Sequence, residues 1–337
     1  MNGCKRSIVL NLKTDEGKDL LRDLVRAGDV LVENFAPGVL DRLGVGAAAL
    51  QDINPRLIYA QSSGYGTSGP YRDYPAMDLT VQAMSGVMSI TGFQDRPPVK
   101  AGPALCDFFA GVHLYGAVAT ALYERERTGV GRRVEVAMLD AVYPSLGSSL
   151  GLHFDTQGDV PPRTGNRHAG LAEAPYNVYP TSDGYIAILC VSETHWKSLL
   201  RVMDRGDLAS DPRFGSLADR VKNIDLVDAT ISEWTRTRSK QDLFEALMTN
   251  RVPCAPVRNL TEVVNDPHLH ARGMLQWQDH PELGRIIVQH SPLRFAGDPQ
   301  RTLEPSHALG ADTERVLEDR LGLRPEQISD LAERGVI

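Results

Sequence analysis

Helix patterns and strand patterns alternate along the first part of the chain, and this order limits the folds open to it. An acidic first turn at residues 14–17 precedes apolar residues at three- and four-residue steps, which is typical of an amphipathic helix. Residues 30–32 and 56–60 have strand character, as do residues 7–12 before them. The order predicts a parallel sheet with helices on its faces, and residues 133–138 predict a further strand.

Length and composition favour two domains. A chain of 337 residues with 42% hydrophobic residues exceeds the usual size of one domain. A proline- and glycine-rich connector at residues 158–167 predicts a boundary near residue 160. Beyond it the patterns predict a hairpin (176–179 and 185–189), helices (195–203, 217–235 and 240–249), a strand in 284–295 and two tail helices (311–321 and 325–334).

Charge and residue usage exclude several functional classes. The net charge of −7 argues against a nucleic-acid partner, although a small basic pocket could still bind a phosphorylated ligand. The four cysteines and nine histidines show no metal-ligand spacing. No run approaches the roughly 18 apolar residues that span a bilayer, and we find no signal peptide. We therefore expect a cytoplasmic protein without a metal or a membrane partner.

One carboxylate, Asp107, interrupts an apolar, glycine-punctuated run at residues 99–129. The apolar residues after it recur with helical spacing, which places Asp107 at the N-terminal end of a buried helix. It can be an N-cap worth about 1 kcal/mol. It can also be a carboxylate that the helix dipole keeps ionised for attack on an electrophile. Cys106 beside it has no histidine nearby in sequence and is interpreted as a core residue.

Three further segments carry candidate binding residues. Residues 32–44 join a strand end to a short helix, which suits Asn34, the Phe35 backbone and Arg42 to a nucleotide-like ligand, or to an ordinary tight turn. Residues 62–73 form a glycine-rich loop that is neither GxGxxG nor a P-loop, and Arg72 could meet a phosphate from it. Asp78 precedes an apolar helical pattern and is interpreted as its cap.

Several motifs together resemble the class III CoA-transferases, of the formyl-CoA transferase and crotonobetainyl-CoA:carnitine CoA-transferase type. They are KRSIVLNLKTDEGK, DVLVENFAPGVLDRLG, NPRLIYAQSSGYGTSGPYRD, MDLTVQAMSGVMSITG and the Asp107 run, and they follow in the family's order. The resemblance implies a Rossmann-like parallel-sheet large domain over residues 1–160, a smaller α+β domain over 161–283, and a tail, 284–337, that returns to the large domain. It also implies an interlocked homodimer with the active site near the subunit interface.

The resemblance implies an enzyme that moves CoA between an acyl-CoA thioester and a small carboxylic acid, with no permanently bound cofactor. Asp107 would attack the thioester and form an aspartyl anhydride and then an aspartyl-CoA thioester. Lys13 and Arg42 would supply local positive charge for the CoA phosphates. The full set of implied CoA contacts is Leu10, Lys13, Asn34, Phe35, Arg42, Met77 and Asp78, with Arg72 in place of a basic residue that the family has where this chain has Pro75.

Two alternatives remain at this point. The 2-methylacyl-CoA racemases share the fold but use a histidine where this chain has Met77, and a thioether cannot exchange a proton. Family members also begin with a further N-terminal segment, so a truncated CoA-binding protein without activity is the second alternative. The glycine-rich loop of formyl-CoA transferase is not evident around residues 165–170, which argues against formate or oxalate as a substrate.

Overall fold

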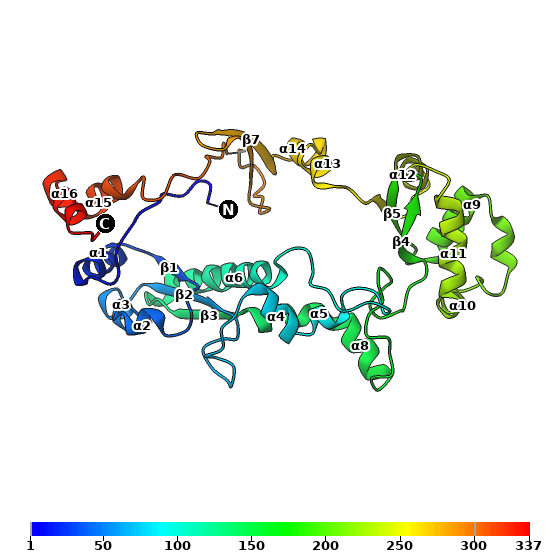
Figure 1. Cartoon of the computed structure of the whole chain (residues 1–337), viewed down its shortest axis with the longest axis horizontal. Coiled ribbons are helices and arrows are strands. Elements are labelled where there is room, and N and C mark those ends of the chain that lie inside the picture. The colour runs from blue at the N-terminus through cyan, green and yellow to red at the C-terminus, as the bar shows by residue number, and fades with distance from the viewer. Residues whose placement is uncertain (1, 300) are drawn as a thin grey trace. The chain divides into compact units, whose positions relative to one another are not determined.

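A computed structural model describes residues 2–299 and 301–337 of the chain, which has an α/β fold (Figure 1). Its internal contacts form two compact units. The first unit contains the chain up to Ser63, Leu114–Glu135, and everything from Arg258 onward. The second contains Gly64–His113 and Val136–Val257. Contacts thus divide the chain at residues other than the expected boundaries, which remain a prediction.

The first unit contains the expected parallel pairing. β1 (Val30–Glu33) pairs in parallel with β2 (Ile58–Ser63), and β3 (Arg133–Ala137) lies on the other side of β2. α1 (Asp15–Arg26) begins where expected, because the Thr14 side chain accepts the Gly17 amide hydrogen. α2 (Val39–Arg42) and α3 (Ala47–Ile53) follow β1. The buried core joins these elements through Val25, Leu40, Val45, Ala47, Leu50, Leu57 and Tyr59.

The C-terminal tail packs on α1 within the same unit. α15 (Thr313–Leu321) and α16 (Pro325–Glu333) form a small core with Leu20. Before them lie α13 (Leu260–Val264), α14 (Pro267–Ala271) and an antiparallel hairpin of β7 (Leu275–His280) and β8 (Gly284–Gln289). The tail helices are therefore neighbours of the first helix of the chain.

Residues 7–12 are not a strand, contrary to their pattern. Their backbone groups bond instead to the tail, since Asp312 Oδ2 accepts the Ser7 amide hydrogen at 2.7 Å and Thr313 Oγ1 accepts that of Val9 at 3.0 Å. The Asn11 amide donates to the Val336 carbonyl at 2.8 Å. These side-chain and carbonyl partners satisfy the segment without a neighbouring strand.

The second unit has two parts with separate cores, one of which surrounds the start of α6 (Leu105–Thr128). Here α4 (Asp78–Met84), α5 (Val87–Ile90), α7 (Met138–Val142), the short helix η1 (Tyr143–Leu146) and α8 (Gly147–Asp155) accompany α6. Cys106 is fully buried in this core, among Val81, Val87, Ala110, Met138, Ala141, Val142 and Leu146. The expected helix after Asp107 is confirmed, but the expectation that it is buried is wrong, because apolar residues along it such as Phe108 and Tyr115 are exposed.

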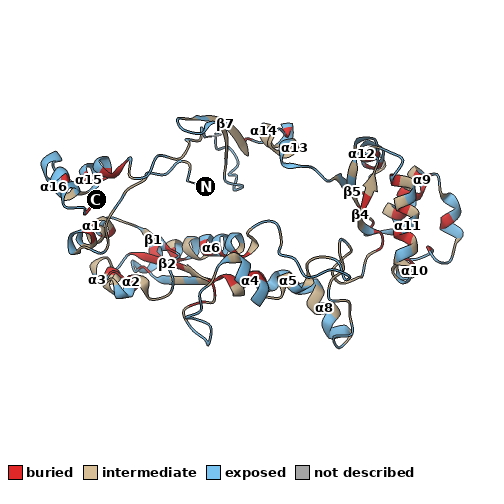
Figure 2. Cartoon of the chain, in the orientation of Figure 1, coloured by how far each residue is buried: buried red, intermediate tan, exposed pale blue. Residues whose placement is uncertain are grey.

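The other part is an antiparallel sheet covered by helices. β4 (Tyr176–Thr181), β5 (Gly184–Leu189) and β6 (Cys254–Pro256) form the sheet. α9 (Glu193–Met203), η2 (Gly206–Ser210), α10 (Leu217–Lys222), α11 (Ile224–Thr235) and α12 (Lys240–Thr249) accompany it, with buried residues concentrated on α9 and α11 (Figure 2). The expected hairpin is confirmed, whereas the single helix expected over 217–235 is two helices.

Arg220 is buried within this part. Its guanidinium, 1% exposed, donates to Glu193 Oε1 at 2.7 Å and to the Ala174 carbonyl at 3.0 Å. It also lies over the Trp196 ring at 4.9 Å. A buried charge with an ion pair and carbonyl acceptors is satisfied, so Arg220 links α10 to α9.

α6 exposes much of its apolar surface in the single chain. Phe108, Val112, Tyr115 and Tyr123 are all exposed. By length and composition alone the helix could cross a membrane, which corrects the expectation that no run approaches that length. Core helices of soluble proteins pass the same test, and this one finding is weak support for a membrane span.

Candidate active site

Asp107 lies in the first turn of α6 but does not cap it. The helix begins at Leu105, and its free amides are bound by a different carboxylate, that of Asp78. Asp78 Oδ1 accepts the amide hydrogens of Cys106 at 2.8 Å and Asp107 at 3.4 Å. The expected role of Asp78 as cap of its own helix is wrong, because it is the first residue of α4 and Met77 occupies the N-cap position. Asp78 caps α6 instead.

The Asp107 carboxylate is exposed and makes no hydrogen bond with any described residue. Partial desolvation, followed by the charge of Asp78, raises the pKa of Asp107 above its ordinary value. Burial, with the same two carboxylates, raises the pKa of Cys106 to about 11, so its thiol stays neutral. The pair therefore offers one unpaired carboxylate of raised pKa beside a thiol that stays protonated.

A cavity of about 480 Å³ in the first unit brings together four predicted CoA contacts, Leu10, Lys13, Phe35 and Arg42. The remaining lining residues are Asn11, Leu12, Val39, Leu40 and Leu43. The side chains of Lys13 and Arg42 have no hydrogen bond or ion pair with any described residue. An apolar cavity with two unpaired cations suits a ligand that combines apolar surface with negative charge.

The Phe35 end of this cavity is fixed by Glu33, a residue that the sequence analysis missed. Glu33 ends β1 and is buried, and its Oε2 accepts the Phe35 amide hydrogen at 2.7 Å. Its Oε1 accepts the Tyr59 hydroxyl hydrogen at 3.3 Å. Burial raises the pKa of Glu33 despite these bonds. The sequence signal that could have identified Glu33 is a charged residue at the end of an otherwise apolar strand.

The predicted contact Asn34 is exposed and does not line the cavity.

The other predicted contacts, Arg72, Met77 and Asp78, belong to the second unit, as Asp107 does. Arg72 is exposed, and its Nε pairs with Asp73 at 3.2 Å. Met77 is exposed beside Asp78. Asp78 is thus the predicted contact that the structure joins directly to the Asp107 backbone.

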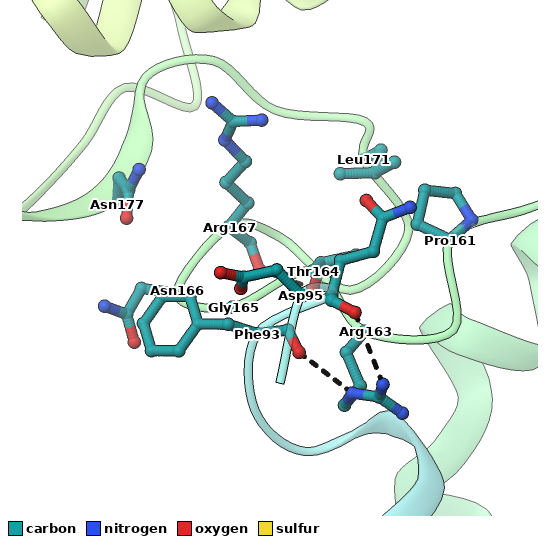
Figure 3. A pocket seen from close by; sticks show the side chains of 11 residues that line it. Phe93, Asp95, Pro161, Arg163, Thr164, Gly165, Asn166, Arg167, Leu171 and Asn177 are labelled. Atoms are coloured by element: carbon teal, nitrogen blue, oxygen red, sulfur yellow. Dashed lines mark hydrogen bonds between the residues drawn. The ribbon is translucent and has the colours of Figure 1, made fainter. Parts of the chain in front are cut away.

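A larger cavity of about 670 Å³ in the second unit contains none of the predicted site residues. Its two arginines are already engaged: Arg163 donates to the carbonyls of Phe93 at 3.0 Å and Gln94 at 3.5 Å (Figure 3). Arg167 pairs with Asp225 and Asp228. We therefore place no site there. Among the described residues no group of three or more metal-ligating side chains occurs.

Comparison with known proteins gives consistent matches. The family described as CoA-transferase family III matches residues 1–313. The chain is 36% identical over 352 residues to formyl-CoA:oxalate CoA-transferase of Streptomyces avermitilis, covering 100% of this chain and 85% of the relative. It is 37% identical over 317 residues to succinate–glutarate CoA-transferase of Agrobacterium fabrum, covering 94% and 78%. A crystal structure of a CaiB/BaiF family protein from Brucella suis has a TM-score of 0.81 and 34% identity, covering 95% and 82%.

Proposed function

The chain belongs to CoA-transferase family III and is a class III CoA-transferase, and from this premise we propose that Asp107 is its nucleophile. The observation that carries the proposal is the free Asp107 carboxylate at a helix start whose amides Asp78 already occupies. Its raised pKa supports the proposal, because a more basic carboxylate is a better nucleophile.

In the proposed reaction an Asp107 carboxylate oxygen attacks the thioester carbonyl of the donor acyl-CoA. The C–S bond breaks, which gives an aspartyl mixed anhydride and a CoA thiolate. The thiolate attacks the aspartyl carbonyl and expels the donor carboxylate, leaving an aspartyl-CoA thioester. The acceptor carboxylate then attacks this thioester, and the released thiolate attacks the acceptor acyl carbonyl. New acyl-CoA leaves, Asp107 is regenerated, and no net proton is consumed.

The amides of Cys106 and Asp107 are not free donors for the tetrahedral oxyanions, since Asp78 accepts both. Other amides would supply that stabilisation, worth roughly 3 kcal/mol per donor in acyl-transfer sites. The positive end of α6 acts on the nucleophile through its dipole alone.

For CoA we propose the cavity that Lys13 and Arg42 line, with both cations on phosphates and the exposed Phe35 ring against the adenine. Leu10 and Asn34 would complete this contact. Arg72, Met77 and Asp78 stay proposed CoA contacts on the strength of the family resemblance alone. The acceptor would be a small carboxylic acid. Both relatives described above have a dicarboxylate in their names, so succinate and glutarate are the first acceptors to assay. Oxalate is assayed beside them, because it is in the name of one relative although residues 165–170 argue against it.

We also propose a cytoplasmic, interlocked homodimer without nucleic-acid or membrane partners. The exposed apolar residues of α6 support a protein partner, because a surface of this kind is rarely left uncovered in a soluble protein. CoA serves as a substrate, and we propose no permanently bound cofactor.

Hydroxylamine trapping tests the nucleophile. With acyl-CoA, wild-type protein should yield a hydroxamate at Asp107 by mass spectrometry, and Asp107→Asn should yield none and lose transfer. Asp155→Asn, at an exposed aspartate that ends α8, is the matched control. Continued transfer by Asp107→Asn would sink the proposal. Deuterium entering the α-position of a 2-methylacyl-CoA would favour the racemase instead.

A further inference from the structure

Gln82 is a fully buried amide in α4, and both of its polar ends are bonded. Its Nε2 donates to Asp78 Oδ2 at 2.6 Å and, at 3.4 Å, to the Pro103 carbonyl. Its Oε1 accepts the Ala101 amide hydrogen at 2.8 Å. One side chain therefore joins the Asp78 carboxylate to the loop that leads into α6.

This network decides which carboxylate occupies the start of α6. Asp78 uses Oδ1 for the amides of Cys106 and Asp107, while Gln82 holds Oδ2. Acidic side chains in the first helical turn readily bond free N-terminal amides. If Asp78 turned away, those amides would be open to the carboxylate of Asp107, and a bonded carboxylate is a weaker nucleophile.

The polarity of the glutamine amide suits this task. Asp78 Oδ2 needs a donor and the Ala101 amide needs an acceptor, and one carboxamide supplies both. An ionised carboxylate at position 82 would repel Asp78, and an apolar side chain would leave both groups without a partner in a buried site.

We propose that Gln82 is a positioning residue of the transfer reaction: it holds the Asp78 carboxylate on the α6 amides and the Ala101–Pro103 loop in place, which leaves the Asp107 carboxylate free to attack. The inference rests on the proposed nucleophilic role of Asp107. It assigns Gln82 no contact with either substrate.

The charged and titratable groups around Asp107 define a pH test. They are Asp78 on α4, Cys106 on α6, and Lys100 in the preceding loop, whose Nζ donates to the carbonyls of Ala101 and Gly102 at 3.1 Å each. Asp78 is the charged neighbour that raises the pKa of Asp107. Releasing Asp78 should therefore move the acid limb of the pH–rate profile to lower pH.

Three variants test the proposal: Gln82→Met, Gln82→Glu and the control Gln61→Met. Gln61 is a buried glutamine in β2, bonded to Arg133 outside this network. We expect Gln82→Met to lower kcat on the order of 10- to 100-fold, with KM for acyl-CoA changed less than about 2-fold and the acid limb at lower pH. Gln61→Met should leave the limb in place.

The Gln82→Glu variant should come closer to wild-type kcat as the pH falls. Its protonated carboxyl can donate to Asp78 and accept from Ala101, so its kcat relative to wild type should rise as the pH falls. If Gln82→Met does not fold, the pH dependence of kcat for Gln82→Glu against wild type tests the proposal. Wild-type kcat and an unmoved acid limb in Gln82→Met, or no relative gain for Gln82→Glu at low pH, would overturn this inference alone. Transfer by Asp107→Asn would overturn the proposed nucleophile and this inference together.

Discussion

The Glu33 carboxylate accepts the Phe35 amide hydrogen at 2.7 Å, which fixes the turn between β1 and the rim of the Lys13–Arg42 cavity. The same carboxylate is buried and accepts the Tyr59 hydroxyl hydrogen. Its raised pKa shows that burial outweighs these two bonds. The turn is therefore held by a group whose ionised form the fold disfavours.

Glu33→Gln should increase the free energy of unfolding near neutral pH and not near pH 4. The folded pKa lies above the ordinary value of 4.5, so folded protein binds a proton that the unfolded chain has lost. The contribution of Glu33 to stability is therefore fully present below its unfolded pKa of 4.5. It is lost as the pH rises through the higher pKa of the folded protein. Urea unfolding at both pH values measures the difference. Glu282→Gln, at an exposed glutamate, is the control, and a variant less stable than wild type near pH 7 would contradict the prediction.

Transfer activity should fall on the acid side at a higher pH than an aspartate of ordinary pKa would give. Attack requires ionised Asp107, and its pKa is raised, so the reactive fraction is lost earlier as the pH decreases. Asp78→Asn removes the neighbouring charge and should move this limb to lower pH without abolishing it, because desolvation remains. Profiles of kcat/KM against pH for the two proteins provide the measurement, and coincident limbs would refute it.

Arg42→Ala and Lys13→Ala should each raise KM for acyl-CoA by about 10-fold, with kcat nearly unchanged. Each variant removes one unpaired cation from the cavity, a loss of about 1.4 kcal/mol in binding. The effect should shrink in high salt, because screening weakens the wild-type contact. Arg26→Ala, on the exposed end of α1, controls for general loss of charge. A fall in kcat with constant KM would argue against a binding role.

Arg220→Met should destabilise the second unit by about 3 kcal/mol. It leaves the buried Ala174 and Phe214 carbonyls without their donor and removes the partner of Glu193. Arg213→Met, at an exposed arginine that pairs with Asp211, should change thermal unfolding little. Equal losses of thermal stability in the two variants would contradict the prediction that the buried Arg220 bonds stabilise this unit.

Val112→Asp on α6 should shift the proposed homodimer toward monomer. Val112 lies between Phe108 and Tyr115 on the face that is exposed in the single chain. In the dimer that face would be covered, and burying an unpaired charge in an apolar interface is costly. Light scattering after size-exclusion chromatography measures the mass of wild type and variant. Glu126→Gln, near the other end of α6, is the control. A wild-type mass equal to one chain would refute the dimer itself.

Local patterns predicted the regular elements because their signals lie within one helix or strand. The Thr14 cap and the leucine spacing placed α1, and the apolar run after Asp107 placed α6. The strand predicted over residues 7–12 was wrong for the opposite reason. The backbone groups of this segment bond to residues some 300 positions away, such as Asp312. Alternation alone cannot reveal such a partner.

The site was predictable only in part for the same physical reason. The strand-to-helix segment suggested Phe35 and Arg42, and the family resemblance added Leu10 and Lys13, which line the same cavity. The bond from Asp78 to Cys106 spans 28 residues and depends on how α4 packs beside α6. Its carboxylate looked like a cap in the sequence, and only the packing shows which helix it caps.

The bonds from residues 7–11 to the tail make the cavity depend on the order of protein synthesis. The Asn11 side chain accepts the Lys13 amide hydrogen, and its backbone and amide groups donate to Val336 and Gly335. The carbonyls that anchor the Lys13 loop are translated more than 300 residues after Lys13 itself. A chain without Gly335 and Val336 would lack the acceptors of both Asn11 bonds, so its Lys13 loop would not be anchored. The Lys13 side of the cavity is therefore held in place only once Gly335 and Val336 have been synthesised.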